Sequence, residues 1–70
     1  MTQDNELLHR MVTEGHELMD KIEKLHGFML TEDFNMLEDV EQSLLSAQWN
    51  AMKAYADVLS IRIAREMGEV

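Results

Sequence analysis

The chain of 70 residues contains no cysteine and no proline, and it has only three glycines. Without cysteine, disulfide bonds and thiolate metal sites are excluded, and a reducing compartment is compatible with the composition. The stretch from residue 44 to residue 64 contains neither glycine nor proline, so nothing in it interrupts a helix. These absences favour long helices that are held together without covalent cross-links.

Positive charge is also scarce. Six Lys and Arg residues stand against fourteen Asp and Glu residues, which gives a formal net charge of −8. Duplex nucleic acid is bound mainly by cations that neutralise its phosphates, so we expect no duplex partner. Salt confines the influence of an exposed charge to roughly 8 Å. A local cationic pocket for a small anionic ligand therefore remains compatible with an acidic chain.

Long hydrophobic runs are missing too. No run approaches the roughly 18 residues of a membrane span, and the segment MTQDNELLHR lacks the basic and apolar regions of a signal peptide. We therefore expect a soluble cytoplasmic protein without a membrane partner. The length predicts a single helical domain, residues 1–70. Such a domain rarely gains more than about 3–5 kcal/mol from its own core, so it usually depends on partners.

A heptad pattern of apolar residues and one glycine runs from residue 8 to residue 29. Its members, spaced alternately by three and four, are Leu8, Met11, Gly15, Leu18, Ile22, Leu25 and Met29. This spacing keeps one stripe of a helix facing a partner helix, and Gly27 is suited to end that helix. We predict a first helix over about residues 4–26. Gly15 costs about 1 kcal/mol relative to alanine, and we expect close approach of another backbone as its compensation.

Residues 27–38, GFMLTEDFNMLE, form the predicted connector. Thr31 is suited to cap a short turn that carries two acids at its positive end, with Phe34 and Leu37 as apolar anchors. Asp39 followed by Gln42 resembles a capping box, so we predict a second helix over about residues 39–67. The fold class is therefore all-α, a helical hairpin of two long helices with a short connecting turn.

Apolar residues cover most of the circumference of the predicted second helix. Its clearly polar strip consists only of Ser46, Asn50, Lys53, Asp57 and Ser60. Two paired helices cover one stripe of each other, and a helix that is apolar on most sides needs further neighbours. We therefore predict a homo-oligomeric helical bundle in which the second helices pack together. Dimer, tetramer and hexamer are all compatible with the pattern.

Three polar residues interrupt this apolar helix at intervals of seven. Gln48, Tyr55 and Arg62 align on one edge, because seven residues fall only about 20° short of two full turns. One interpretation is a structural network, in which a buried Arg62 pairs with an acid of the first helix or of another subunit. A second is a cleft between subunits, where the side chains bind a phosphate and a base. A third interpretation places these side chains at the rim of the helix packing, where their polar ends reach water.

No arrangement typical of catalysis is visible in the sequence. A Ser–His–acid set, a paired-carboxylate cleft and a glycine-rich phosphate loop are all missing, so we expect no enzyme and no cofactor. The segment HELMD is not a zinc motif, because Asp20 stands where the second histidine would be, and we expect no metal site. The many acids fit a soluble helical rod. They also fit a mimic of a nucleic-acid backbone that blocks a protein.

The segments ELMDKIEKLHGFM and LLSAQWNAMKAYADVLSIRI resemble a family of very short helical proteins from crAss-like and other tailed phages. The resemblance covers roughly residues 17–65, and its more specific part is the second segment. The positions that match the family pattern there are Leu44, Leu45, Gln48, Ala51, Met52, Tyr55, Leu59 and Arg62.

The plan is also similar to the small helical anti-CBASS and anti-Thoeris sponges of phages, which oligomerise and trap cyclic nucleotide immune signals between subunits without cleaving them. That resemblance implies a ligand site for a cyclic di- or oligonucleotide. Arg62 would clamp a phosphate, with Lys53 and Arg65 as nearby cations, Tyr55 as the stacking group and Gln48 as the hydrogen-bonding amide. Met52 lies between them on the same edge. The alternative function is an acidic helical interaction module that inhibits or adapts a host protein.

Overall fold

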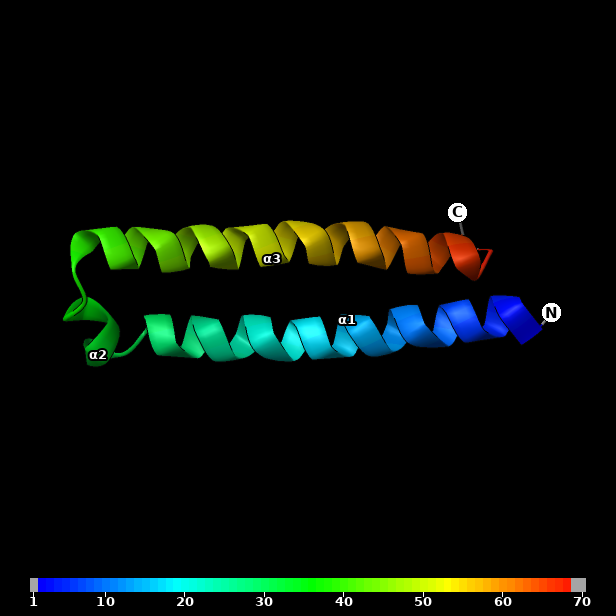
Figure 1. Ribbon diagram of the computed structural model, residues 1–70, viewed down its shortest axis with the longest axis horizontal. Helices are drawn as coiled ribbons and strands as arrows, with labels where there is room; N and C mark the ends of the chain where they lie inside the picture. The colour runs from blue at the N-terminus through cyan, green and yellow to red at the C-terminus, as the bar shows by residue number, and fades with distance from the viewer. Residues whose placement is uncertain (1, 69–70) are drawn as a thin grey trace.

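The computed structural model describes residues 2–68, with side chains from Glu6 onward. This part of the chain forms three helices and no strand: α1 (Thr2–Met29), α2 (Glu32–Asn35) and α3 (Asp39–Glu66). Figure 1 shows α1 and α3 side by side and running in opposite directions, with α2 in the connection between them. The rod measures 51 × 16 × 15 Å. The all-helical prediction is confirmed.

The first helix extends further than the sequence predicts. It continues through Gly27 to Met29, and the only positive φ among the described residues belongs to Gly68. Gly27 therefore does not end the helix in a left-handed conformation. Thr31 stands just beyond the actual end, where its hydroxyl donates to the Phe28 carbonyl oxygen at 2.6 Å.

The connector is built around the short helix α2. Thr31 caps it as predicted, because its Oγ1 accepts a hydrogen bond from the Phe34 backbone N–H at 3.3 Å. Phe34 is buried and meets the Phe28 ring edge-on, with 6.0 Å between the ring centroids. The connector is thus a packed corner in which the two aromatic rings fix the end of α1 against α2.

The predicted capping box at the start of α3 is wrong. Residue Glu38 precedes the helix and makes no capping hydrogen bond through its side chain. Instead, the Gln42 amide nitrogen donates to the carbonyl oxygens of Leu37, at 2.9 Å, and Asn35, at 3.2 Å. Gln42 therefore ties the connector to α3 rather than reaching back to the helix start.

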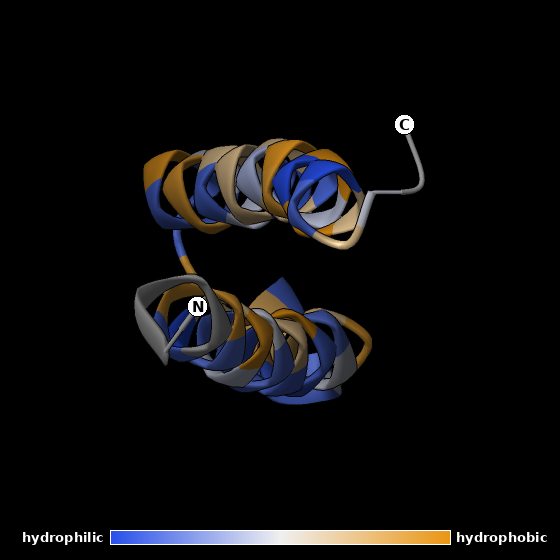
Figure 2. Ribbon diagram, turned by 90° about the vertical axis from the view of Figure 1, so that its right-hand side faces the viewer, coloured by the Kyte–Doolittle hydropathy of each residue, from blue (hydrophilic) through white to orange (hydrophobic). Residues whose placement is uncertain are grey.

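Helix α3 carries two apolar seams, each spaced alternately by three and four residues. The inner seam faces α1, is buried or half-buried, and consists of Leu45, Trp49, Met52, Ala56, Leu59 and Ile63. The outer seam is exposed along its whole length and consists of Val40, Leu44, Ala47, Ala51, Ala54, Val58 and Ile61. Figure 2 shows hydrophobic colour on the side of α3 away from α1, whereas the outer side of α1 is mainly hydrophilic.

The core between the helices is small. Among the described side chains only Met11, Ile22, Phe34 and Leu59 are buried, and Leu59 is the most enclosed, at 2% exposure. Half-buried apolar side chains surround them. A core of this size gives a modest free energy of unfolding. Within residues 2–68, no helix is both long and apolar enough to cross a membrane.

Gly15 does not serve the close backbone approach that the sequence suggested. A Cβ atom at this position would meet only side-chain atoms, Ile63 Cδ1 and Leu59 Cδ2, each at 3.8 Å. That distance is an ordinary van der Waals contact, so alanine fits without any shift of the neighbouring helix.

We therefore expect Gly15→Ala to raise the free energy of unfolding by about 1 kcal/mol, because alanine is the better helix former. Urea denaturation at one fixed protein concentration measures the change. Gly27→Ala is the matched control, since a Cβ there contacts nothing within 4 Å and lies near the helix end. The Gly27→Ala variant should gain less. A loss of stability in Gly15→Ala would contradict the ordinary contact distances to Leu59 and Ile63.

Candidate functional site

A cleft of about 230 Å³ lies where the start of α1 meets the end of α3. Leu7 and Met11 contribute to it from α1, and Arg62, Arg65 and Glu66 contribute from α3. The two arginines are three residues apart, a spacing that places side chains on neighbouring parts of one helix face. Arg65 lies in the last turn of α3, where a cation is stabilised by the helix dipole.

The cleft presents two guanidinium groups beside an apolar floor. Met11 is buried, whereas Arg62 and Arg65 are exposed. Among the side chains that the structure describes, neither arginine forms a salt bridge, since the ion pair found is Lys24–Asp20. One interpretation of the sequence buries Arg62 and pairs it with an acid of the first helix or of another subunit. The single chain instead leaves this guanidinium accessible, and its planar set of donors matches phosphate oxygens.

Tyr55 is fixed by an acid from the opposite helix. Its hydroxyl donates to Glu14 Oε2 at 2.6 Å, and the residue remains 41% exposed. The hydrogen bond to Glu14 is the main cause that raises the pKa of Tyr55, and the negative charge of Glu14 adds to the effect while Arg62 opposes it. The bond holds the phenol ring in one place and leaves it accessible for stacking.

The other predicted site residues lie away from the arginine cleft. Gln48 is exposed and Met52 is half-buried in the inner seam. The Lys53 ammonium nitrogen lies over the Trp49 ring, 4.6 Å from its centroid, and the other neighbour of that ring is His26, stacked at 5.2 Å. A single chain therefore brings Arg62 and Arg65 together, but not Gln48 or Lys53 with them.

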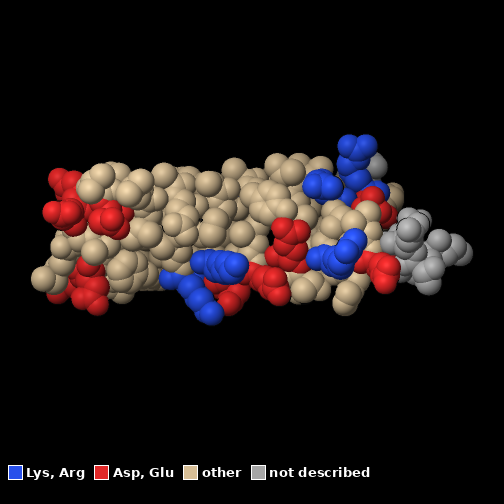
Figure 3. All heavy atoms as spheres, in the orientation of Figure 1, with Lys and Arg blue, Asp and Glu red and all other residues tan. Residues whose placement is uncertain are grey.

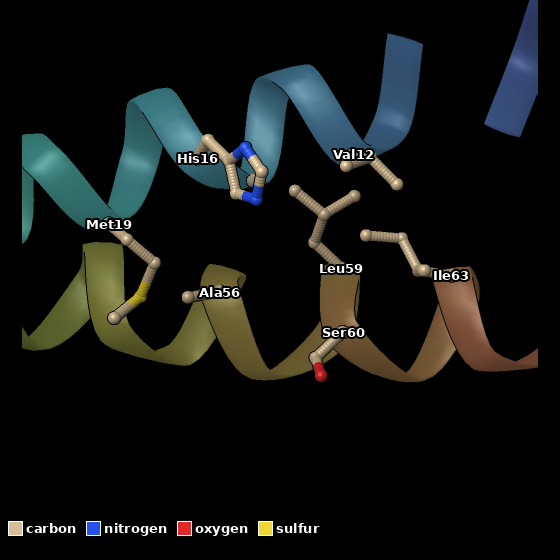
Figure 4. A pocket seen from close by; sticks show the side chains of 8 residues that line it. Val12, His16, Met19, Ala56, Leu59, Ser60 and Ile63 are labelled. Atoms are coloured by element: carbon tan, nitrogen blue, oxygen red, sulfur yellow. The ribbon is translucent and has the colours of Figure 1, made fainter. Parts of the chain in front are cut away.

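A second hollow, of about 320 Å³, runs between the two long helices. Figure 4 shows His16 and Met19 above it from α1, with Ala56, Leu59 and Ile63 below it from α3. The Ser60 hydroxyl points away from α1. This groove is mainly apolar, and no Lys or Arg is among its lining residues. The arginine cleft is therefore the better candidate for an anionic ligand.

Charge is distributed unevenly along the rod. Residues 30–45 contain five acids and no Lys or Arg, whereas Arg10, Arg62 and Arg65 belong to the opposite end. On the face in view, Figure 3 shows acidic side chains alone at the connector end and cations from the middle to the other end. The arginine cleft thus lies at the end with the least negative charge.

Sequence reasoning missed the α1 residues of this region. Leu7, Met11 and Glu14 complete the surroundings of Arg62 and Tyr55, but their role depends on the register between α1 and α3. The sequence pattern predicts that the helices pair and leaves open which residues lie opposite. Once the register is known, Glu14 is the acid that meets Tyr55.

Fold and cleft together define a small all-helical protein with a cleft lined by two arginines at one end of a helix pair. The Sequestin family model matches residues 5–65, and the chain belongs to the Sequestin family. It is also 41% identical, over 56 residues, to an uncharacterized 7.5 kDa protein in the denB–rIIB intergenic region of Enterobacteria phage T4. The match covers 80% of this chain and 88% of that protein. These similarities place the chain among short phage proteins, and no solved structure matches it.

The bond between Tyr55 and Glu14 predicts an elevated tyrosine pKa that can be measured directly, because the chain has a single tyrosine. Ultraviolet titration of tyrosinate should give a pKa above the ordinary value of about 10. In the folded state the neutral phenol is the donor, so its contribution to stability is present below about pH 10. That contribution disappears as the pH rises through the raised pKa.

Glu14→Gln removes the negative acceptor and should return the tyrosine pKa toward its ordinary value. Glu17→Gln, an exposed acid on the same helix, is the control and should leave the titration unchanged. Equal titration curves for Glu14→Gln and the natural protein would show that the bond does not form in solution.

Proposed function

We propose that this protein is a non-enzymatic phage sponge that binds a cyclic di- or oligonucleotide immune signal between subunits and sequesters it in the cytoplasm of the infected cell. The observation that carries the proposal is the convergence of Arg62 and Arg65 on one cleft with an apolar floor. The family name, Sequestin, supports sequestration as the mode of action. Binding without cleavage is enough to inhibit a defence system that depends on a diffusible signal.

The chemistry of the cleft suits a nucleotide that carries phosphates and bases together. Each guanidinium can donate two parallel hydrogen bonds to a phosphate, which fixes orientation as well as charge. The exposed ring of Tyr55 offers a face for a base, and base–aromatic stacking contributes about 1–3 kcal/mol. Gln48 would supply an amide to a base edge, and a second subunit is needed to bring it close.

The net charge of −8 opposes a polyanionic ligand. Exposed charges are screened over roughly 8 Å at physiological salt, so within one chain the distant acids at the connector end act weakly on the arginine cleft. Glu66 and Glu14 are closer and do disfavour a phosphate. The proposal therefore places the phosphate against the two arginines, and it leaves the Glu14 carboxylate to hold the tyrosine hydroxyl.

A panel of cyclic nucleotides tests the proposed function. One or a few of them should raise the melting temperature, because a ligand that binds only the folded state stabilises it by mass action. Heat denaturation should then release the nucleotide intact, as chromatography can verify. A panel without any thermal shift contradicts the proposal, and release of a cleaved product contradicts the sponge mechanism.

Arg62→Ala should weaken binding of the identified nucleotide by about 1.5–3 kcal/mol, the net contribution of a hydrogen bond to a charged group. The free protein should keep its mass and melting temperature, because Arg62 is exposed and its removal relieves repulsion between neighbouring arginines. Calorimetry measures the affinity, and light scattering measures the mass. Lys21→Ala, which removes an equal charge from an exposed position of α1, is the control. Unchanged affinity in Arg62→Ala would remove Arg62 from the site.

One observation favours the alternative function, an acidic interaction module that inhibits or adapts a host protein. Leu30 and Met36 are 74% and 81% exposed at the connector, beside Glu32 and Asp33. Apolar side chains rimmed by acids are typical of protein docking sites. A protein of this kind would ignore every nucleotide in the panel and retain one host protein in a pull-down, and Met36→Glu would abolish that retention.

A further inference from the structure

The outer seam of α3 has the pattern of a helix interface although α1 does not cover it. Its seven residues keep the alternating three- and four-residue spacing of a coiled coil from Val40 to Ile61, over a length of about 32 Å. All seven are exposed, and none is polar. An exposed apolar stripe of this regularity is a partner surface for another helix.

The sizes of the side chains are symmetric about the centre of the seam. Bulky residues stand at both ends, three alanines stand in the middle, and Ala51 is the midpoint. When the seam meets its own copy in the antiparallel direction, Val40 lies opposite Ile61 and Leu44 lies opposite Val58. Ala47 then lies opposite Ala54, and Ala51 meets Ala51. The surface is therefore complementary to itself under a two-fold axis, as a symmetric dimer interface must be.

We infer that α3 pairs through its outer seam with the α3 of a second copy, in the antiparallel direction, and that this second copy completes the candidate nucleotide site. This inference deepens the proposed function. Only the role of the completed site in nucleotide binding rests on that function. The dimer itself follows from the seam.

Charge selects the antiparallel direction. The connector end contains five acids and no Lys or Arg, namely Glu32, Asp33, Glu38, Asp39 and Glu41, while Arg62 and Arg65 lie at the other end of α3. A parallel pair would place the acids of one copy beside the acids of the other. The antiparallel pair brings each acidic end to an arginine end, which favours association and penalises the parallel arrangement.

The same geometry explains the polar line of α3. Gln48, Tyr55 and Arg62 each come directly after an outer-seam residue and occupy the flank of the seam, together with Glu41. In antiparallel helix pairs these flanks face one another. Tyr55 then lies opposite Gln48 of the partner subunit, and Arg62 lies opposite Glu41 of the partner subunit.

A single chain separates Gln48 from Arg62 by fourteen residues, or about 21 Å along the helix. In the dimer, Gln48 of the partner subunit stands beside Tyr55, within about 11 Å of Arg62 along the axis. Two equivalent sites result, one on each side of the two-fold axis. Each takes its phenol and its guanidinium from one subunit and its amide from the other, so neither site is complete in a monomer.

Cysteine cross-linking tests the register, because the natural chain has no cysteine. A chain with Ala47→Cys and a longer, tagged chain with Ala54→Cys are mixed without nucleotide and oxidised. We expect the mixed disulfide to exceed either homodisulfide roughly tenfold, since Cα atoms more than about 7 Å apart are not bridged without backbone movement. Abundant homodisulfides with little mixed product would show a parallel pair, and no disulfide at all would overturn the interface.

A charge inside the seam provides the second test. Ala51→Glu places two carboxylates against each other at the two-fold axis, so light scattering at micromolar concentration should show the mass falling from dimer to monomer. Ser60→Glu, exposed on the same helix outside the seam, should leave the dimer intact. A dimeric Ala51→Glu variant would overturn the proposed interface. Circular dichroism measures the helix content of the Ala51→Glu variant. If the separated chains unfold, the fall in mass no longer tests the interface, and the cross-linking result decides whether the interface exists.

The two proposals fail separately. Mixed disulfides from a protein that no cyclic nucleotide stabilises would leave the dimer standing and refute the sponge. A nucleotide-dependent thermal shift in a protein that forms no such disulfide would leave the sponge standing and refute this assembly. If both hold, Gln48→Ala chains mixed with Arg62→Ala chains should recover binding in part. Mixed dimers contain one site with both groups intact, whereas dimers of either variant alone contain none.

Discussion

Helix α3 has two apolar seams, and the chain supplies only one helix to cover them. The inner seam packs on α1, and this single contact creates the core around Met11, Ile22 and Leu59. The surroundings of the candidate site also follow from the position of α3 relative to α1. That position fixes the register that brings Tyr55 to Glu14, and it brings the start of α1 beside the two arginines at the end of α3. It also leaves the outer seam in contact with water.

The sequence predicts the helices well because their signals are local. Heptad spacing specifies two long helices, and Thr31 specifies the cap of the short helix between them. It predicts the helix ends less well. Gly27 lies within α1, since a glycine permits a left-handed conformation without requiring it. Gln42 has the spacing of a capping box, yet its amide donates to carbonyl groups of the connector.

The candidate site is predicted less completely than the fold. Seven-residue spacing identifies Gln48, Tyr55 and Arg62 as one line, but it does not reveal which side of that line is buried. The structure places the line between the inner and outer seams, at the flank of both. Glu14 and Leu7 escape sequence reasoning altogether, because only the register between two helices brings them to the site. The resemblance implies that Lys53 is a cation near the phosphate, and in the single chain its ammonium group lies over Trp49.

The flank position reconciles two of the three interpretations of Arg62 that the sequence leaves open, namely the pair with an acid of another subunit and the ligand site. A guanidinium beside a helix interface can pair with an acid of another subunit when no ligand is present, and it can exchange that acid for a phosphate. Such a rim pair contributes little to stability, about 0–1 kcal/mol, so exchange costs little. A fully buried pair would resist exchange, because separating its members strands a charge at a cost of about 3–5 kcal/mol. An arginine that must both specify an assembly and release its partner to a ligand is therefore better placed at the flank of a seam than within it.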